Sequence, residues 1–199
     1  KNNLVLPASE LKKLLNARVA YRILVDDVAA AISRRNVEYL AKNPILKSDR
    51  ATSGFELGSM GGFYTYAEVL QQLDEMKTLY PNLITSRFSI GTSYEGRTVW
   101  AVKISDNPDT NESSTEAPVY FDALHHSREP ASMATVINFM FHLLENYASD
   151  PRIGYIVNNR EIFIVPVVNP DGYEYNRQTN PNGGGMWRKN RRINSGSSC

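Results

Sequence analysis

The chain has 199 residues, of which 42% are hydrophobic and 22% are charged, and its formal net charge is +1. This length is ample for one hydrophobic core of ordinary size, and the near-neutral charge gives no reason to expect a nucleic-acid-binding protein. No apolar run is long enough to span a membrane, so we expect neither nucleic acid nor a membrane as a partner. A single cysteine excludes a disulfide bond within these residues.

The first part of the chain, residues 1–41, predicts a small α+β segment. Three leucines in residues 11–15 fit a short amphipathic helix, residues 19–25 have the β-branched pattern of a strand, and residues 28–40 return to helical spacing. A helix–strand–helix fragment of this size can bury little surface by itself. Residues 42–62 are rich in charge and glycine, which predicts a linker.

Helices and strands are expected to alternate in residues 63–199, which predicts an α/β fold with a sheet flanked by helices. The expected helices are residues 66–80, 131–147 and 151–158. The expected strands are residues 83–90, 98–104, 118–124 and 160–168, of which the first two should form an antiparallel hairpin. The strand at 118–124 is apolar and aromatic, so we expect it to be buried. Residues 106–116 are polar and predict a surface loop.

A candidate metal site follows the strand at 118–124. His126 and Glu129 lie three positions apart, between that strand and the helix at 131–147. Zinc binds imidazole nitrogen and carboxylate oxygen, and a catalytic zinc site uses three protein ligands and a water. In open α/β sheets, ligands bind beyond the carboxyl ends of strands. The pair is a weak signal alone, but its position makes both residues candidate zinc ligands.

No other residue is expected to complete this site. His125 should point to the opposite face from its neighbour His126. His142 lies about a dozen residues into the next helix, roughly 18 Å from Glu129 at 1.5 Å per residue. Cys199 ends a tail rich in serine and glycine. The chain therefore offers two zinc ligands rather than three.

Four stretches in order resemble the zinc carboxypeptidase family, of the pancreatic carboxypeptidase A and bacterial carboxypeptidase T type. The segment 126–129, His-Ser-Arg-Glu, resembles the first metal-binding motif of that family. Residues 89–97 resemble its glycine-bearing turn, residues 168–173 its loop after a core strand, and residues 186–191 the segment that carries its oxyanion-stabilising arginine. The resemblance extends from about Tyr64 to the end of the chain.

The resemblance implies a function and a set of roles. It implies a secreted, zinc-dependent metallocarboxypeptidase that hydrolyses the C-terminal bond of peptides or proteins, with zinc bound by His126 and Glu129. Arg188 would stabilise the oxyanion and bind substrate, and Arg128 would lie near the subsite for the residue before the scissile bond. The alternative for Arg188 is a basic surface run with its neighbours. Asp171 is expected only to form a turn, and Trp187 only to pack.

The same resemblance implies that the third zinc ligand, the carboxylate clamp and the general-base glutamate follow Cys199. We therefore expect residues 63–199 to be the N-terminal part of a C-terminally incomplete catalytic domain. We expect this part to have no peptidase activity when it is alone. Two other classes remain open. One is a catalytically inactive carboxypeptidase-like binding domain, and the other is a relative that cleaves peptidoglycan or another amide.

Residues 1–41 resemble the end of the propeptide that such enzymes carry, which implies a monomeric zymogen opened by an activating protease. Lys47 and Arg50 in the linker would suit a trypsin-like protease. The alternative is a small N-terminal adaptor of the same topology. No signal peptide is visible at the start of the chain.

Overall fold

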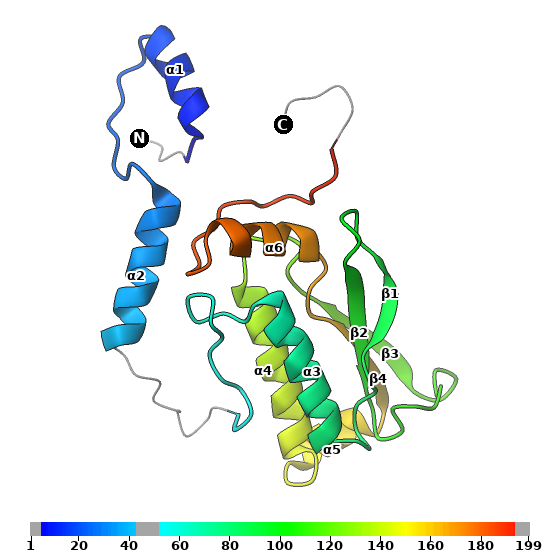
Figure 1. Ribbon diagram of the computed structural model, residues 1–199. Helices are drawn as coiled ribbons and strands as arrows, with labels where there is room; N and C mark the ends of the chain where they lie inside the picture. The colour runs from blue at the N-terminus through cyan, green and yellow to red at the C-terminus, as the bar shows by residue number, and fades with distance from the viewer. Residues whose placement is uncertain (1–4, 43–51, 194–199) are drawn as a thin grey trace.

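A computed structural model of the protein describes residues 5–42 and 52–193 and shows a mixed α/β fold (Figure 1). Its sheet has four strands in the order β1-β2-β4-β3. The strands are β1 Phe88–Thr92, β2 Thr98–Ile104, β3 Ala117–Asp122 and β4 Arg160–Val165. The predicted fold class, a mixed sheet flanked by helices, is confirmed.

The strand pairing brings two loops to one edge of the sheet. β1 and β2 form the expected antiparallel hairpin, and β2 pairs antiparallel with β4. β3 and β4 are parallel, with Val119 opposite Ile162. Parallel strands need a crossover, which α4 and α5 provide. The segments that follow β3 and β4 therefore leave the sheet at the same edge.

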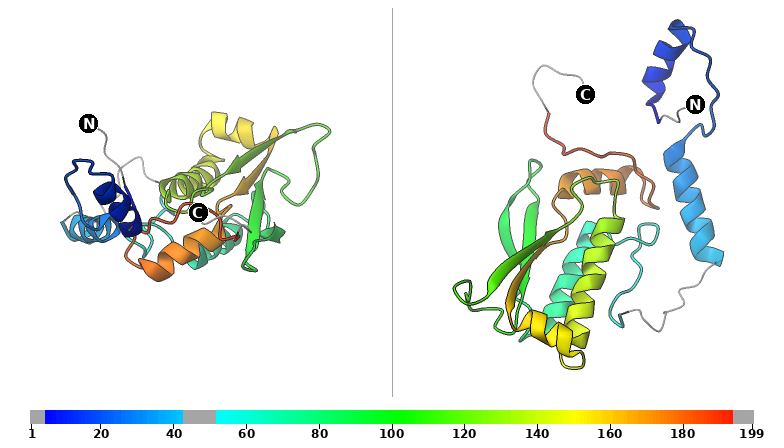
Figure 2. Two further views of the ribbon diagram at one scale, coloured as in Figure 1. Left: turned by 90° about the horizontal axis from the view of Figure 1, so that it is seen from above. Right: turned by 180° about the vertical axis from the view of Figure 1, so that it is seen from behind.

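Four helices accompany the sheet: α3 Tyr66–Leu79, α4 Ala131–Asn146, α5 Pro151–Val157 and α6 Pro170–Thr179. Figures 1 and 2 show α3 and α4 side by side on one face of the sheet. Leu73 of α3 and Met140 of α4 are fully buried in one core with Ile104 and Ile162 of the strands. The three predicted helices are therefore confirmed. Their apolar faces are covered by the sheet, as their sequence patterns predict.

Helix α6 was not predicted, because residues 168–173 were interpreted as a loop. Asn169 caps this helix by accepting a hydrogen bond from the backbone N–H of Gly172, and Pro170 occupies its first turn. Asparagine before proline is a known helix-start signal. The helix also shortens the preceding strand, since β4 ends at Val165 rather than at residue 168.

Two other strands also differ from their predictions. β1 begins at Phe88, and the residues before it contribute only an isolated bridge between Ile84 and Ile104. β3 was expected to be buried, but only Val119 in it is half-buried. The reason is its position at the edge of the sheet, where β4 is its only partner among the described strands. An edge strand can keep an apolar sequence and still be exposed.

The N-terminal segment contains helix α1, Ala8–Asn16, and helix α2, Val28–Lys42, both as expected. The strand predicted at residues 19–25 is wrong, because this stretch has no strand structure and its apolar side chains are exposed. No neighbouring strand lies within the described residues to satisfy its backbone groups. None of the helices in the described part of the chain is long and apolar enough to cross a membrane.

Part of the segment predicted as a linker makes contacts with the rest of the chain. Residues 52–62 pack onto the α/β part, where Met60 is buried and the backbone N–H of Gly54 donates to the Glu145 carboxylate at 2.6 Å. Lys47 and Arg50, the candidate cleavage positions, lie outside the described residues, as does Cys199.

Candidate active site

The turn between β3 and α4 carries His126 and Glu129, and an unusual backbone conformation begins it. Leu124 has φ of +57°, a left-handed value that a bulky residue rarely adopts. Its side chain is buried, its N–H donates to Ser132 Oγ at 3.1 Å, and its carbonyl accepts from Asn169 N–H at 3.2 Å. These contacts hold the bend that directs the chain out of the strand.

His126 and Glu129 face each other across this turn. The Nδ1 atom of His126 lies 3.0 Å from Oε2 of Glu129. Both side chains are about half exposed, and they line an open pocket of about 430 Å³ beyond the end of β3. The hydrogen bond with His126 holds the pKa of the Glu129 carboxyl below its ordinary value, and the charges of Arg188 and Arg128 act in the same direction.

Arg188 reaches the same point from 62 positions further along the chain. Its Nη2 atom lies 3.1 Å from Nδ1 of His126, and its Nε atom lies 3.6 Å from Oε1 of Glu129. The guanidinium is 46% exposed. The structure therefore brings three of the four predicted site residues into one cluster at the carboxyl edge of the sheet.

The donor atoms in this cluster suit a zinc ion. Nδ1 of His126 cannot donate to the Glu129 carboxylate and accept from the Arg188 guanidinium at the same time. Nδ1 and the Oε2 atom of Glu129 lie 3.0 Å apart, so one cation can contact both atoms in place of the hydrogen bond between them. Tetrahedral zinc separates its nitrogen and oxygen ligands by about 3.3 Å, which is close to the separation seen. The pair thus fits two positions of a zinc site.

The histidines that were set aside have other contacts. His125 Nε2 lies 3.6 Å from Oδ2 of Asp122, and His142 lies beside Asn146 on α4. Within the described residues, three acidic side chains also lie close enough together to hold a cation, and they are Asp106, Glu112 and Glu116. That group precedes β3, whereas the His126 site follows it, so the two are at opposite ends of the strand.

Two arginines in the basic run after Trp187 make different contacts. Arg188 turns toward His126, whereas the guanidinium of Arg191 stacks over Tyr175 at 3.9 Å and over Trp187 at 4.5 Å. Arg191 also pairs with Glu95 at 3.0 Å. Arg188 is therefore not simply one cation of a solvated surface run, and Trp187 packs as expected.

Arg128 is exposed, and its charge lies near Glu129. The structure does not bring it into the cluster of His126, Glu129 and Arg188 by any direct contact. Its role in binding substrate remains a prediction.

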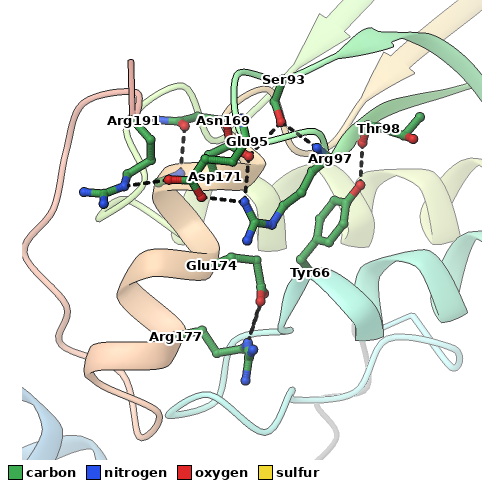
Figure 3. A network of polar contacts seen from close by, with 11 residues as sticks. Tyr66, Ser93, Glu95, Arg97, Thr98, Asn169, Asp171, Glu174, Arg177 and Arg191 are labelled. Atoms are coloured by element: carbon green, nitrogen blue, oxygen red, sulfur yellow. Dashed lines mark hydrogen bonds and ion pairs between the residues drawn. The ribbon is translucent and has the colours of Figure 1, made fainter. Parts of the chain in front are cut away.

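A polar network around Asp171 joins the turn between β1 and β2 to α6 (Figure 3). Asp171 is 3% exposed and accepts hydrogen bonds from Ser93 Oγ at 2.7 Å, from the backbone N–H of Glu95 at 2.8 Å and from Arg97 at 2.8 Å. Burial alone would raise the pKa of the Asp171 carboxyl, but these donors outweigh it and hold the pKa below its ordinary value. Asp171 therefore does more than form a turn, because it fastens the 91–96 turn to α6.

Two buried asparagines were not identified from the sequence. Asn169 donates to the carbonyls of His125 at 3.1 Å and of Lys189 at 3.0 Å. Asn176 donates to the carbonyls of Ser127 and Trp187. Asn169 before Pro170 was a detectable helix cap. Nothing in the local pattern marked Asn176, because its partners are distant in the sequence.

Comparison with known proteins shows which proteins this chain is similar to. The family described as "Zinc carboxypeptidase" matches residues 69–199. A zinc carboxypeptidase from Saccharothrix mutabilis subsp. capreolus is 38% identical over 134 residues, which are 67% of this chain and 30% of that protein. Carboxypeptidase A2 from Mus musculus is 30% identical over 181 residues, which are 91% of this chain and 39% of that protein. The chain thus spans less than half the length of these curated relatives.

A solved structure shares the fold. The crystal structure of thrombin activatable fibrinolysis inhibitor superimposes with a TM-score of 0.65 at 26% identity, over 96% of this chain and 43% of that one. Both parts of the chain, before and after residues 43–51, are therefore included in the likeness.

Proposed function

Because this chain belongs to the zinc carboxypeptidase family, we propose that its protein is a metallocarboxypeptidase that hydrolyses the C-terminal bond of peptides or proteins. The observation that carries the proposal is the convergence of Arg188 on His126 and Glu129. A fold alone would not require these three side chains to meet. A catalytic centre for acyl transfer requires it, since a metal site and an oxyanion donor must face the same carbonyl.

Each residue has a distinct task in this proposal. His126 and Glu129 would hold the ion through an imidazole nitrogen and a carboxylate oxygen. When bound, zinc polarises the scissile carbonyl and lowers the pKa of its water toward neutrality. Arg188 donates hydrogen bonds to the carbonyl oxygen as negative charge develops there. Its permanent charge and fixed fork of donors suit that task.

The remaining parts of the machinery follow from the family resemblance. A third zinc ligand, a general-base glutamate and a clamp for the terminal carboxylate would come from residues beyond Cys199. Arg128 would contact the substrate before the scissile bond, and its exposure beside Glu129 leaves it free to do so. A peptide C-terminus is the substrate class that such a clamp selects.

The experiment uses the complete protein and its His126→Ala variant. We expect the wild type to contain about one zinc and to release the C-terminal residue of a blocked dipeptide, with activity lost on chelation. His126→Ala should lose both zinc and activity, because one of two ligands in this segment is removed. Zinc binding without hydrolysis would favour an inactive binding domain. Cleavage of a peptidoglycan amide in place of the dipeptide would favour the amide-hydrolysing alternative.

We further propose that the N-terminal segment is the end of a propeptide and that the protein is secreted as a zymogen. Helix α2 packs against the chain that leads from α6 to Arg188, since a Cβ atom at Gly184 would lie 2.6 Å from the carbonyl oxygen of Ala29. The described N-terminal residues do not line the pocket at His126. Limited trypsin treatment should cleave near Lys47 or Arg50 and raise activity. Equal activity before and after the cut would reject the zymogen.

A further inference from the structure

One buried asparagine joins the segment that carries the candidate zinc ligands to the segment that carries Arg188. Asn176 is on α6 and is 4% exposed. Its Nδ2 atom donates to the carbonyl of Ser127 at 3.0 Å and to the carbonyl of Trp187 at 2.8 Å. Its Oδ1 atom accepts from the backbone N–H of Trp187 at 2.9 Å. The amide therefore uses both donor hydrogens and its acceptor within the protein.

The positions of these partners make the link specific. Ser127 lies between the two candidate zinc ligands, and Trp187 directly precedes Arg188. Because Asn176 binds both the N–H and the carbonyl of Trp187, it fixes the peptide planes on both sides of that residue. The Arg188 Cα atom then has little freedom, since it belongs to the second of these planes.

Ser127 closes the link from the other side. Its hydroxyl donates to the Trp187 carbonyl at 2.6 Å, and its backbone N–H donates to the Arg188 carbonyl at 3.2 Å. The Trp187 carbonyl thus receives hydrogen bonds from Ser127 and Asn176 together. The turn that carries the candidate zinc ligands, the segment of Trp187 and Arg188, and helix α6 therefore form one hydrogen-bonded unit.

Asn176 is closely packed. A Cβ atom at Gly185 would lie 2.6 Å from both Cβ and Oδ1 of Asn176. Trp187 packs its ring edge-on against Tyr175 at 5.2 Å, one residue before Asn176 in the helix. A buried amide held this closely keeps a single orientation.

We propose that Asn176 is a positioning residue that sets the place of the Arg188 guanidinium relative to the metal site. This inference rests on the proposed function, because it concerns the residue that would bind the oxyanion. Asn176 itself does not touch His126 or Glu129. It acts through the backbone of Trp187 and, by its hydrogen bond to the Ser127 carbonyl, also contacts the turn between the candidate zinc ligands. The larger part of its effect on the reaction should pass through Arg188, because two of its three hydrogen bonds are to Trp187.

Aspartate is the sharpest substitution at this position. Asn176→Asp keeps the shape of the side chain and the acceptor for the Trp187 N–H. It removes both donated hydrogen bonds and places a carboxylate oxygen against two carbonyl oxygens. The Trp187–Arg188 segment should then move away from α6, whereas the zinc ligands remain supported by Leu124 and its partners.

The first measurement is a double-mutant cycle in the complete protein. We expect Asn176→Asp to lower kcat on a blocked dipeptide by about tenfold to a hundredfold with zinc content unchanged. In an Arg188→Ala background the same substitution should have a much smaller effect, since the residue through which it mainly acts is absent. Val157→Ala in α5 is the control for lost stability, and it should lower Tm without changing kcat. Equal losses of kcat in both backgrounds, or an unchanged kcat, would overturn the proposal.

The second measurement does not depend on activity. Hydrogen exchange in the peptide that covers residues 186–190 should become faster in Asn176→Asp, because the Trp187 carbonyl loses the donor that ties this segment to α6. Exchange in α4 should stay unchanged. If the wild type proves inactive, or if Arg188→Ala keeps full activity, the proposed function fails. The exchange measurement alone then tests whether Asn176 positions the segment of Arg188. Faster exchange would still support the positioning of the segment by Asn176, and unchanged exchange would refute it.

Discussion

The guanidinium of Arg188 lies 3.1 Å from Nδ1 of His126, although 62 positions of chain separate the two residues. The contact exists because parallel strands β3 and β4 send their following segments to the same edge of the sheet, where α6 turns the chain back toward His126. A candidate metal ligand and a cation meet there on an open surface. This arrangement explains why both residues belong to one site rather than to a strand end and a basic tail.

The buried Asp171 network predicts a stability that depends on pH. Its folded-state pKa is lowered, so its contribution is present above the unfolded-state pKa of about 3.9 and is lost as pH falls through the folded value. Asp171→Asn should lower the free energy of unfolding by about 1–3 kcal/mol at pH 7, because the ionised acceptor of Arg97 is removed. The difference from wild type should shrink below about pH 4.

Urea denaturation at several pH values measures this effect. Asp109→Asn is the matched control, since Asp109 is exposed and pairs loosely with Lys77 at 3.6 Å. Its change should be close to zero, as for most exposed ion pairs. A loss for Asp171→Asn that is equal at pH 3 and pH 7 would show that its charge does not contribute.

The contact of α2 with the chain after α6 can be tested at Gly184. This residue has φ of +88°, and a Cβ atom there would clash with the Ala29 carbonyl. Gly184→Ala should release α2 and speed hydrogen exchange in residues 28–37. Gly96→Ala is the control, because Gly96 has φ of +87° but open space around it. Equal exchange in α2 for both variants would mean that the contact contributes nothing to docking.

The zinc affinity of residues 1–199 alone is a further prediction. Two ligands from one turn hold an ion less well than three, so we expect weak binding by these residues and no hydrolysis of a blocked dipeptide. Isothermal titration with zinc, compared with the His126→Ala form, measures the affinity. Chelator-sensitive turnover by these 199 residues would contradict the prediction.

Local patterns were sufficient to predict helices α3, α4 and α5 and the α/β class, although not α6. Helix α3 has a capping box of Thr65 and Glu68, and α4 has the periodic apolar face that the sheet covers. The same reasoning failed for residues 19–25, where a β-branched sequence has no partner strand among the described residues. Strand formation needs a neighbour, and single-segment patterns do not report one.

The candidate site was predicted in part for a similar reason. His126 and Glu129 are close in the sequence, so spacing and position were enough to single them out. Arg188 required the family resemblance. Asn176 and Asp171 stabilise the site through contacts made across 11 to 78 positions, which no local signal reveals. Their importance became visible only when burial and hydrogen bonds were known.

The most direct test of the account compares Arg188→Ala with His126→Ala in the complete protein. If Arg188 binds the oxyanion as charge develops, Arg188→Ala should lower kcat by about a hundredfold or more with little change in KM and with zinc retained. Lysine at this position should restore only part of kcat, since a point charge cannot match the fork. His126→Ala should lose zinc together with activity. A tenfold rise in KM with kcat intact in Arg188→Ala would contradict the account, because Arg188 would then hold the substrate in its ground state.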